Sequence, residues 1–203
     1  MLAALTGSGL SAAAGLNAFI PFVLVAMLDR FTNLINLPPG LGWISSWLAI
    51  GIAMVLLVAD VVLDKVPGVD HVSDAVQTAV RPAMGGLIFA ASSGASQIEQ
   101  SGWWRDHPWV GVVAGVALAG TVHTGKAMSR PLVNAGTAGI GAPFVSAAED
   151  VASVGTSLVA IFIPILVIGV LLILAVVLLR LYRFRRRSLR RRATTAQAGA
   201  APG

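Results

Sequence analysis

The sequence contains no cysteine and few charged residues. Its 203 residues include only 11% Asp, Glu, Lys and Arg, together with three His. Without cysteine the chain has no disulfides, no thiolate metal sites and no cysteine nucleophile. The low charge content argues against an ordinary water-soluble domain, because about a quarter of the residues in such domains are charged.

Apolar residues predominate in the sequence. They make up 56% of the chain, and the mean hydropathy is +0.83. Between Asp150 and Arg180 the 151–179 run has no charged side chain. At ~1.5 Å per helical residue this run exceeds the ~30 Å hydrocarbon thickness of a bilayer. The sequence therefore predicts an all-α, polytopic membrane protein.

The basic residues are concentrated at the C-terminus. Eight of the fourteen Lys and Arg lie from Arg180 to Arg192. Such a tail after a membrane span is typical of a cytoplasmic terminus that contacts anionic lipid headgroups. No aromatic interleaving or folded basic face accompanies it, so we predict no nucleic-acid binding. We divide the chain into a membrane domain, 1–182, and a basic, mostly disordered cytoplasmic tail, 183–203.

We expect about six spans, and the first of them is a retained segment rather than a cleaved signal. Their approximate limits are 8–28, 43–63, 83–97, 108–123, 132–147 and 156–179. The third and fifth are short and rich in Gly, Ala and Ser, which suggests half-helices or re-entrant segments.

With both termini in the cytoplasm, six spans satisfy the positive-inside rule and predict a multi-pass protein of the inner membrane. The loops on the tail's side then contain Lys65, Arg81, Lys126 and Arg130. The five Trp residues fall at the outer boundary, and Glu149 and Asp150 fall in an outer loop.

A weak internal repeat suggests that the spans form hairpins. The stretch from Trp47 to Arg81-Pro82 parallels the stretch from Trp109 to Arg130-Pro131. Small residues recur in the first, third and fifth spans, where they permit close helix contact in lipid. We expect these spans to be central, and exposed small-residue faces make a homo-oligomer plausible.

Two carboxylates lie near the inner end of the second span. Asp60 and Asp64 are four residues apart, so they share a helix face. Carboxylates near hydrocarbon are costly unless they are paired, protonated or hydrated, which makes them candidates for function. Alternatively, Lys65 neutralises Asp64, while Asp70 and Asp74 simply face water.

The second polar stretch begins at His123, which relays protons or forms an interfacial hydrogen bond. Arg81-Pro82 and Arg130-Pro131 each place an Arg beside a proline at the first turn of a helix. Such pairs bind an anion such as a lipid phosphate, or they serve only as interface anchors.

Further candidates lie in the first and fifth spans. Asn17 near Pro21 suggests a kink that lines a pathway. Glu149 and Asp150 attract cations to an outer vestibule or belong to a solvated loop. His123 has no second His or carboxylate at an i+4 ligand spacing, so we predict no metal and no cofactor. The candidate ligand- or ion-binding residues are Asn17, Asp60, Asp64, Lys65, Asp70, His71, Asp74, Arg81, His123, Lys126, Arg130, Asn134, Ser146, Glu149 and Asp150.

These motifs resemble a family of bacterial polytopic membrane proteins catalogued as domain of unknown function 4126. The resemblance runs from the 9–19 segment, GLSAAAGLNAF, to Pro164. Its most specific pieces are Asp64-Lys65-Val66-Pro67 with Asp70-His71 and Asp74, Arg81-Pro82, His123 with Lys126 and Arg130, and Ser146 with Glu149-Asp150. The resemblance implies a compact helical membrane fold and brings no activity, cofactor or catalytic residue. Ala142 precedes Pro143 where Asn is commoner in the family, which argues against an asparagine-dependent site.

Three functions fit this pattern, and we favour the first. The chain is a transporter or channel for a small solute or ion, with Asp60 and Asp64 in coupling or selectivity. The second is an enzyme or binding protein for lipid headgroups at the cytoplasmic face, with Asp60, Asp64 or His123 in proton transfer. The third is a non-catalytic membrane scaffold or assembly factor.

Overall fold

The computed structural model of the chain describes residues 2–64, 70–95, 107–137 and 140–199. Every secondary-structure element in these ranges is a helix, which confirms the all-α prediction. The elements are α1 (Leu2–Leu16), α2 (Phe19–Phe31), η1 (Pro39–Ser45), α3 (Trp47–Leu63), α4 (Asp70–Ala95), α6 (Pro108–Thr137), α7 (Ala142–Phe162), η2 (Pro164–Leu166) and α8 (Val167–Gly199).

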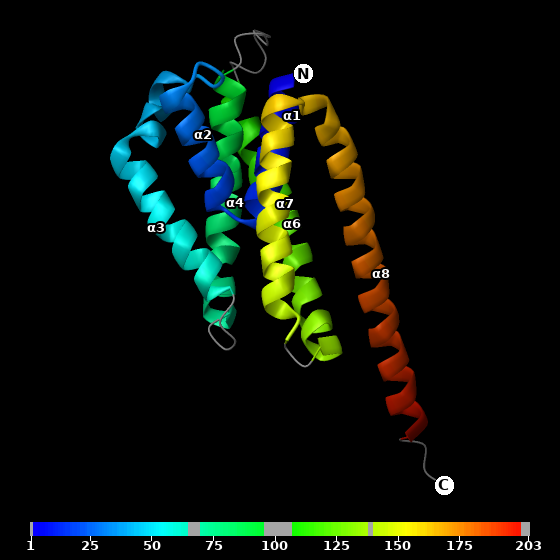
Figure 1. The fold of residues 1–203 in the computed structure, drawn as a ribbon. Helices are drawn as coiled ribbons and strands as arrows, with labels where there is room; N and C mark the ends of the chain where they lie inside the picture. Colours follow the sequence, from blue (N-terminus) through cyan, green and yellow to red (C-terminus); the bar gives the residue numbers. More distant parts are fainter. Residues whose placement is uncertain (1, 65–69, 96–106, 138–139, 200–203) are drawn as a thin grey trace.

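The helices form a membrane-type bundle (Figure 1). Three stretches of the described chain are long and apolar enough to cross a bilayer: Trp109–Thr137, Ala142–Phe162 and Pro164–Phe184. A fourth crossing results if η1 and α3, which meet at 56°, count as one bent span. The multi-pass helical architecture is confirmed, and the number six is approximate.

The expected first span is broken in the middle. The α1 helix ends at Leu16 and α2 begins at Phe19. With 15 and 13 residues, the two helices are ~22 Å and ~20 Å long, so neither crosses ~30 Å of hydrocarbon. Figure 1 shows that α2 turns back toward the end of the bundle at which α1 begins. The pair therefore forms a re-entrant hairpin, which the sequence suggested for the third and fifth spans instead.

The third and fifth expected spans are parts of longer helices. Residues 83–95 are the second half of the 26-residue α4, which also includes the basic Arg81. Residues 132–147 are divided between the end of α6 and the beginning of α7. Local composition misled the prediction here, because Gly and Ala lower the mean hydropathy without ending a helix.

Small residues bring α1, α4 and α6 close together at the centre of the bundle. The α1 helix packs against α4, α6 and α7, and most of its residues from Gly7 to Gly15 are buried. A Cβ atom at Gly15 would lie 2.6 Å from the Ala119 carbonyl oxygen. Glycine is required at this contact, as expected where close van der Waals packing drives helix association in lipid.

The two ends of the chain lie at opposite ends of the bundle in Figure 1. The N-terminal end of α1 is at one end, and the far end of α8 is at the other. The side of a membrane that each end faces stays a prediction.

The contact between α4 and α6 yields a test of the packing. A Cβ atom at Gly115 would meet the Gly85 carbonyl oxygen and would lie 2.8 Å from Phe89 Cβ. Gly115→Ala should therefore lower the free energy of unfolding by about 1–3 kcal/mol through overpacking. The matched control is Gly51→Ala, since a Cβ atom there meets nothing within 4 Å. Thermal unfolding in detergent measures both, and equal melting temperatures for the two variants would contradict the close contact.

Candidate ion-binding site

Ionisable side chains from four helices meet where α1 ends. We call this group the charge cluster; its members are Asp60, Asp64, Arg81, Lys126, Arg130, Glu149 and Asp150. All seven were predicted as candidates from the sequence. They are far apart in the chain, which they span from residue 60 to residue 150. Helical spacing explains how they meet, because Asp60 with Asp64 and Lys126 with Arg130 are i, i+4 pairs that share a helix face.

Asp64 is the centre of the cluster. Its Oδ2 atom accepts hydrogen bonds from Lys126 Nζ and Arg130 Nη2, both at 2.9 Å. Arg81 Nη2 lies 3.7 Å from the same oxygen, and Gln77 Nε2 donates to Asp64 Oδ1 at 3.2 Å. One carboxylate thus joins α3 to α4 and α6.

The cations also bind the broken end of α1. Arg81 Nη1 donates to the Gly15 carbonyl at 3.1 Å, and Lys126 Nζ donates to the Leu16 carbonyl at 3.3 Å. The last carbonyls of a helix lack intrahelical donors and carry partial negative charge. Two positive side chains therefore satisfy backbone groups that lipid could not.

Asn17 performs the corresponding task for the start of α2. Its Oδ1 atom accepts hydrogen bonds from the backbone N–H groups of Phe19 and Ile20, at 3.0 and 3.3 Å. Its Nδ2 atom donates to Asp150 Oδ1 at 3.0 Å. The predicted kink at Asn17 is thus a full helix break, and its amide links the re-entrant hairpin to α7.

Glu149 and Asp150 do not lie in an outer loop, contrary to the six-span layout. Both are inside α7, and Lys126 Nζ lies 3.0 Å from Glu149 Oε2. The error followed from ending the fifth span at Ala147, whereas α7 continues to Phe162. The two acids therefore belong with the basic residues of α6.

The cluster is largely removed from solvent. Arg81 is 0% exposed, Lys126 5% and Asp60 7%. Charges at such burial are tolerated only when they are paired and hydrogen-bonded. The side chains of Arg130 and Glu149 retain slightly more exposure, 14% and 13%, which marks the more accessible side of the cluster.

Like Glu149, whose Oε2 atom accepts no hydrogen bond among the described residues, Asp60 is an incompletely hydrogen-bonded carboxylate of the cluster. Gln77 Nε2 donates to its Oδ1 atom. Its Oδ2 atom accepts no hydrogen bond within the described part of the chain, and Arg81 Nη2 lies 3.6 Å away. Four carboxylates in the cluster oppose three cations, so full ionisation leaves an excess of one negative charge among the described members.

Ser146 on α7 is another incompletely bonded polar residue. Ser146 Oγ is buried and accepts or donates no hydrogen bond among the described residues. Together with Arg130 and Glu149 it lines a cavity of about 10 Å³. This is roughly the space that a single water molecule requires.

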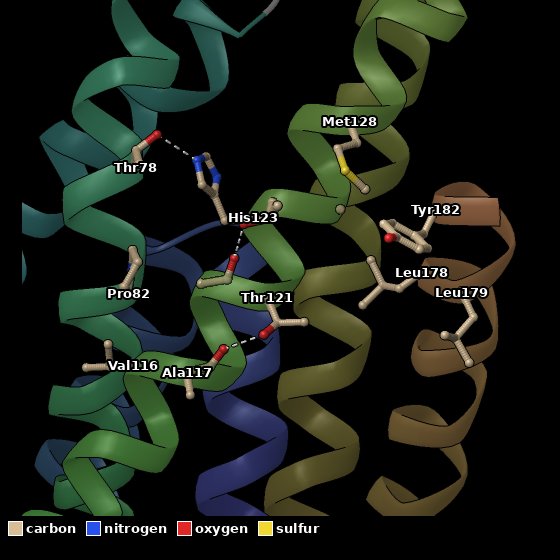
Figure 2. A pocket seen from close by; sticks show the side chains of 13 residues that line it. Thr78, Pro82, Val116, Ala117, Thr121, His123, Met128, Leu178, Leu179 and Tyr182 are labelled. Atoms are coloured by element: carbon tan, nitrogen blue, oxygen red, sulfur yellow. Dashed lines mark hydrogen bonds between the residues drawn. The ribbon is translucent and has the colours of Figure 1, made fainter. Parts of the chain in front are cut away.

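The remaining candidates are placed differently. His123 is buried one turn before Lys126 and shares a 3.0 Å hydrogen bond with Thr78 Oγ1 (Figure 2). It thus contacts α4 rather than a member of the cluster. Lys65 is outside the described residues, as are the side chains of Asp70, His71, Asp74 and Asn134.

The Arg-Pro pairs do not lie at helix starts. Pro82 is inside α4 and Pro131 is inside α6, so neither pair offers the free N–H groups of a first helical turn. The premise of the predicted anion sites, a proline at the first turn of a helix, was therefore wrong, and anion binding at Arg81 or Arg130 stays a prediction. Arg81 and Arg130 instead pair with Asp64.

Gln77 is the participant that the sequence analysis missed. It contacts both Asp60 and Asp64 from α4. Its position four residues before Arg81 places the two side chains on one face of α4, and this spacing could have identified it. Among the described residues no group of three or more His, Asp and Glu is arranged to hold a metal ion.

The central position of Asp64 predicts a large effect of its removal. Asp64→Asn leaves the buried Lys126 and Arg130 without their shared counter-charge, so the free energy of unfolding should fall by about 3–5 kcal/mol. Adding Arg130→Gln should recover part of the loss, because it removes one unpaired cation. Thermal unfolding in detergent checks both, with Asp29→Asn near the opposite end of the bundle as the control. An unchanged melting temperature for Asp64→Asn would contradict this account.

Comparison with known proteins adds a family and no activity. A family model described as a domain of unknown function (DUF4126) matches residues 4–184. No curated protein matches the chain, and no solved structure matches it. The matched range includes the re-entrant hairpin and every member of the charge cluster.

Proposed function

The chain belongs to the domain of unknown function 4126 family, and we propose that this member transports a small monovalent cation, the proton included, across the membrane. The observation that carries the proposal is the buried Asp60 carboxylate, incompletely hydrogen-bonded and next to a broken re-entrant helix. Ionisable groups inside a membrane bundle are expensive and commonly mark ion pathways. Broken helices at mid-membrane are likewise a recurring way to build transporter sites.

The charge balance favours a cation over an anion. Lys126 and Arg130 each bind Asp64 at 2.9 Å, and Arg81 and Lys126 also bind carbonyls of α1. An anion would have to displace a carboxylate from these groups. A cation at Asp60 competes with the longer 3.6 Å ion pair to Arg81 and neutralises the excess negative charge.

The same contacts supply a route from ion binding to conformational change. Arg81 Nη2 lies 3.6 Å from Asp60, while Arg81 Nη1 holds the Gly15 carbonyl at the end of α1. Neutralising Asp60 weakens the attraction on Arg81, and a stronger pull from Asp64 or Gly15 then shifts the guanidinium. Occupancy of Asp60 is thereby communicated to the hairpin, because Arg81 contacts both Asp60 and the end of α1.

A purely structural role is the second candidate. It is favoured by the saturation of Lys126, whose ammonium contacts Asp64, Glu149 and the Leu16 carbonyl. In that case the cluster holds the hairpin in place, and the membrane protein serves as a scaffold. This alternative predicts loss of stability without any ion flux.

Ion flux in proteoliposomes separates these two roles. Vesicles of phosphatidylcholine and phosphatidylglycerol, loaded with a pH-sensitive dye, receive a proton gradient under a valinomycin-set potential; Na⁺ and K⁺ gradients are tested with ion-selective dyes. We expect the wild type to conduct one of these cations faster than empty vesicles. Asp60→Asn should reduce the flux at least about tenfold, since the charge is required in the path. Asp60→Glu should restore part of it.

The control for this experiment is Asp29→Asn. Asp29 accepts a hydrogen bond from the Leu37 backbone, away from the charge cluster. Its flux should equal that of the wild type. If all three cations cross wild-type vesicles no faster than empty ones, or if Asp60→Asn leaves the flux unchanged, cation transport is refuted.

We also propose that the far end of α8 is cytoplasmic and that the N-terminus lies on the other side. The arginine-rich end of α8 supports this orientation through the positive-inside rule. The exposed Trp43 lies in η1, and the exposed Trp47 and Trp109 lie at the start of α3 and α6, where an interfacial aromatic belt is favourable. Arg30 stacks on Trp47 at 4.2 Å there.

Because the chain has no cysteine, single-cysteine variants test this orientation directly. A membrane-impermeant maleimide applied to intact cells should label Leu2→Cys and Asn33→Cys, because both ends of the hairpin face outward. Thr194→Cys should react only after lysis. Protection of Leu2→Cys together with labelling of Asn33→Cys would show that α1 and α2 cross the membrane, against the re-entrant arrangement.

A further inference from the structure

The α8 helix stands away from the bundle and leaves an apolar groove. Only 6% of its most apolar window is buried, against 39% for α6. Between α4, α6 and α8 lies a cavity of about 640 Å³, shown in Figure 2. We call this cavity the α6–α8 groove; it includes Pro82, Ala117, Thr121, Leu178 and Tyr182 in its lining.

The groove continues along α8 toward its N-terminal end. A second cavity of about 240 Å³ shares Ala117, Thr121 and Leu178 with the first and extends to Leu171. From Leu171 to Tyr182 the helix rises ~17 Å. The two cavities together form an elongated slot along a membrane span.

An elongated apolar slot in a bilayer is suited to a hydrocarbon chain. Its lining surface is mostly apolar. Of its polar groups, Thr78 and His123 hydrogen-bond each other, and the hydroxyls of Thr121 and Thr124 donate to carbonyls of their own helix. Water would find few partners there, and an empty space of this size would forfeit dispersion contacts along its whole length.

The basic residues of α8 specify the headgroup. Leu178 and Tyr182 line the groove, and Arg186 follows four residues later on the same helix face. Leu179 and Arg183 have the same relation. Both arginines are exposed, so they flank the basic end of the groove at the level expected for lipid phosphates.

We infer that the α6–α8 groove binds one acyl chain of an anionic phospholipid, whose headgroup phosphate contacts Arg183 and Arg186. Leu178, which lines both cavities, packs onto α6 at Gly125, where a Cβ atom would overlap its side chain. The lipid fills the space that the protein leaves between α6 and α8. It thereby holds α8 against the bundle at a place where side chains alone do not.

Native mass spectrometry of the full chain tests the site. The detergent-solubilised protein is incubated with equal amounts of dioleoyl phosphatidylglycerol and dioleoyl phosphatidylcholine. We expect one retained lipid per chain, with phosphatidylglycerol favoured about tenfold or more because two arginines face its phosphate. Arg183→Gln with Arg186→Gln should abolish the preference, whereas Arg191→Gln with Arg192→Gln should preserve it.

Filling the groove should expel the lipid. Ala117→Trp places an indole in the slot and should reduce retained phosphatidylglycerol at least about tenfold, since the chain loses its apolar contacts. The matched control is Val113→Trp, one turn away on the same helix and 56% exposed outside the groove. Equal retention by Ala117→Trp and the wild type overturns the inference, as does retention of no lipid by the wild type.

A wild-type experiment covers the case in which Ala117→Trp does not fold. Phosphatidylglycerol with a diazirine in one acyl chain is crosslinked to the reconstituted protein, and the adducts are mapped by peptide mass spectrometry. Enrichment on residues 116–128 and 171–182 over the lipid-facing 47–63 supports the groove. Even labelling of all three ranges refutes the proposed lipid site.

Discussion

The fold depends on how the carbonyl groups at the end of α1 are satisfied. A helix that stops inside a bilayer exposes backbone acceptors to a medium without donors, at a cost of several kcal/mol per group. Arg81 and Lys126 supply donors to Gly15 and Leu16, and Asn17 supplies the acceptor for the start of α2. Each cation then requires a counter-charge, which Asp64 and Glu149 provide. The whole charge cluster can thus be understood as the consequence of one broken helix.

This dependence also couples any change in the ion pairs of the charge cluster to the helix break. A group that both pairs with carboxylates and holds backbone carbonyls cannot change one set of partners without affecting the other. Such coupling of a charge site to a movable element is what alternating access requires in transporters with discontinuous helices. If the charge cluster served only to hold the hairpin in place, the same coupling would lower its stability, because any proton reaching Asp60 would loosen the hairpin.

The sequence predicted the membrane class, the helical content and seven members of the cluster, because these depend on composition and on local spacing. The low charge content requires a bilayer, and the i, i+4 pairs Asp60/Asp64 and Lys126/Arg130 place their carboxylates and cations on helix faces. The re-entrant hairpin was not predicted for 8–28. Its apolar residues satisfy a hydropathy window whether the chain crosses or turns back. Only the long-range contacts of Asn17, Gly15 and Leu16 distinguish the two cases, and the local sequence pattern does not reveal such contacts.

The helix limits failed for a related reason. The segments 83–97 and 132–147 were read as separate spans because glycine and the Arg-Pro pairs suggested boundaries. In lipid, a glycine inside a helix is favoured where another helix approaches closely, as Gly85 and Gly115 do. Likewise Pro82 and Pro131 remain inside their helices, since neighbouring groups accommodate proline there. Rules that treat glycine and proline as helix boundaries in water-soluble proteins therefore divide these membrane helices into segments that are too short.

The position of α8 in the chain has a consequence for biogenesis. Every member of the charge cluster precedes residue 151, and the side chains that hydrogen-bond to the helix break at Asn17 in the described part of the chain come from α4, α6 and α7. A ribosome that has released α7 into the membrane has therefore already delivered all the groups that neutralise one another. The α8 helix can insert afterwards and independently. The charged residues of the cluster therefore have their partners in the membrane before translation ends.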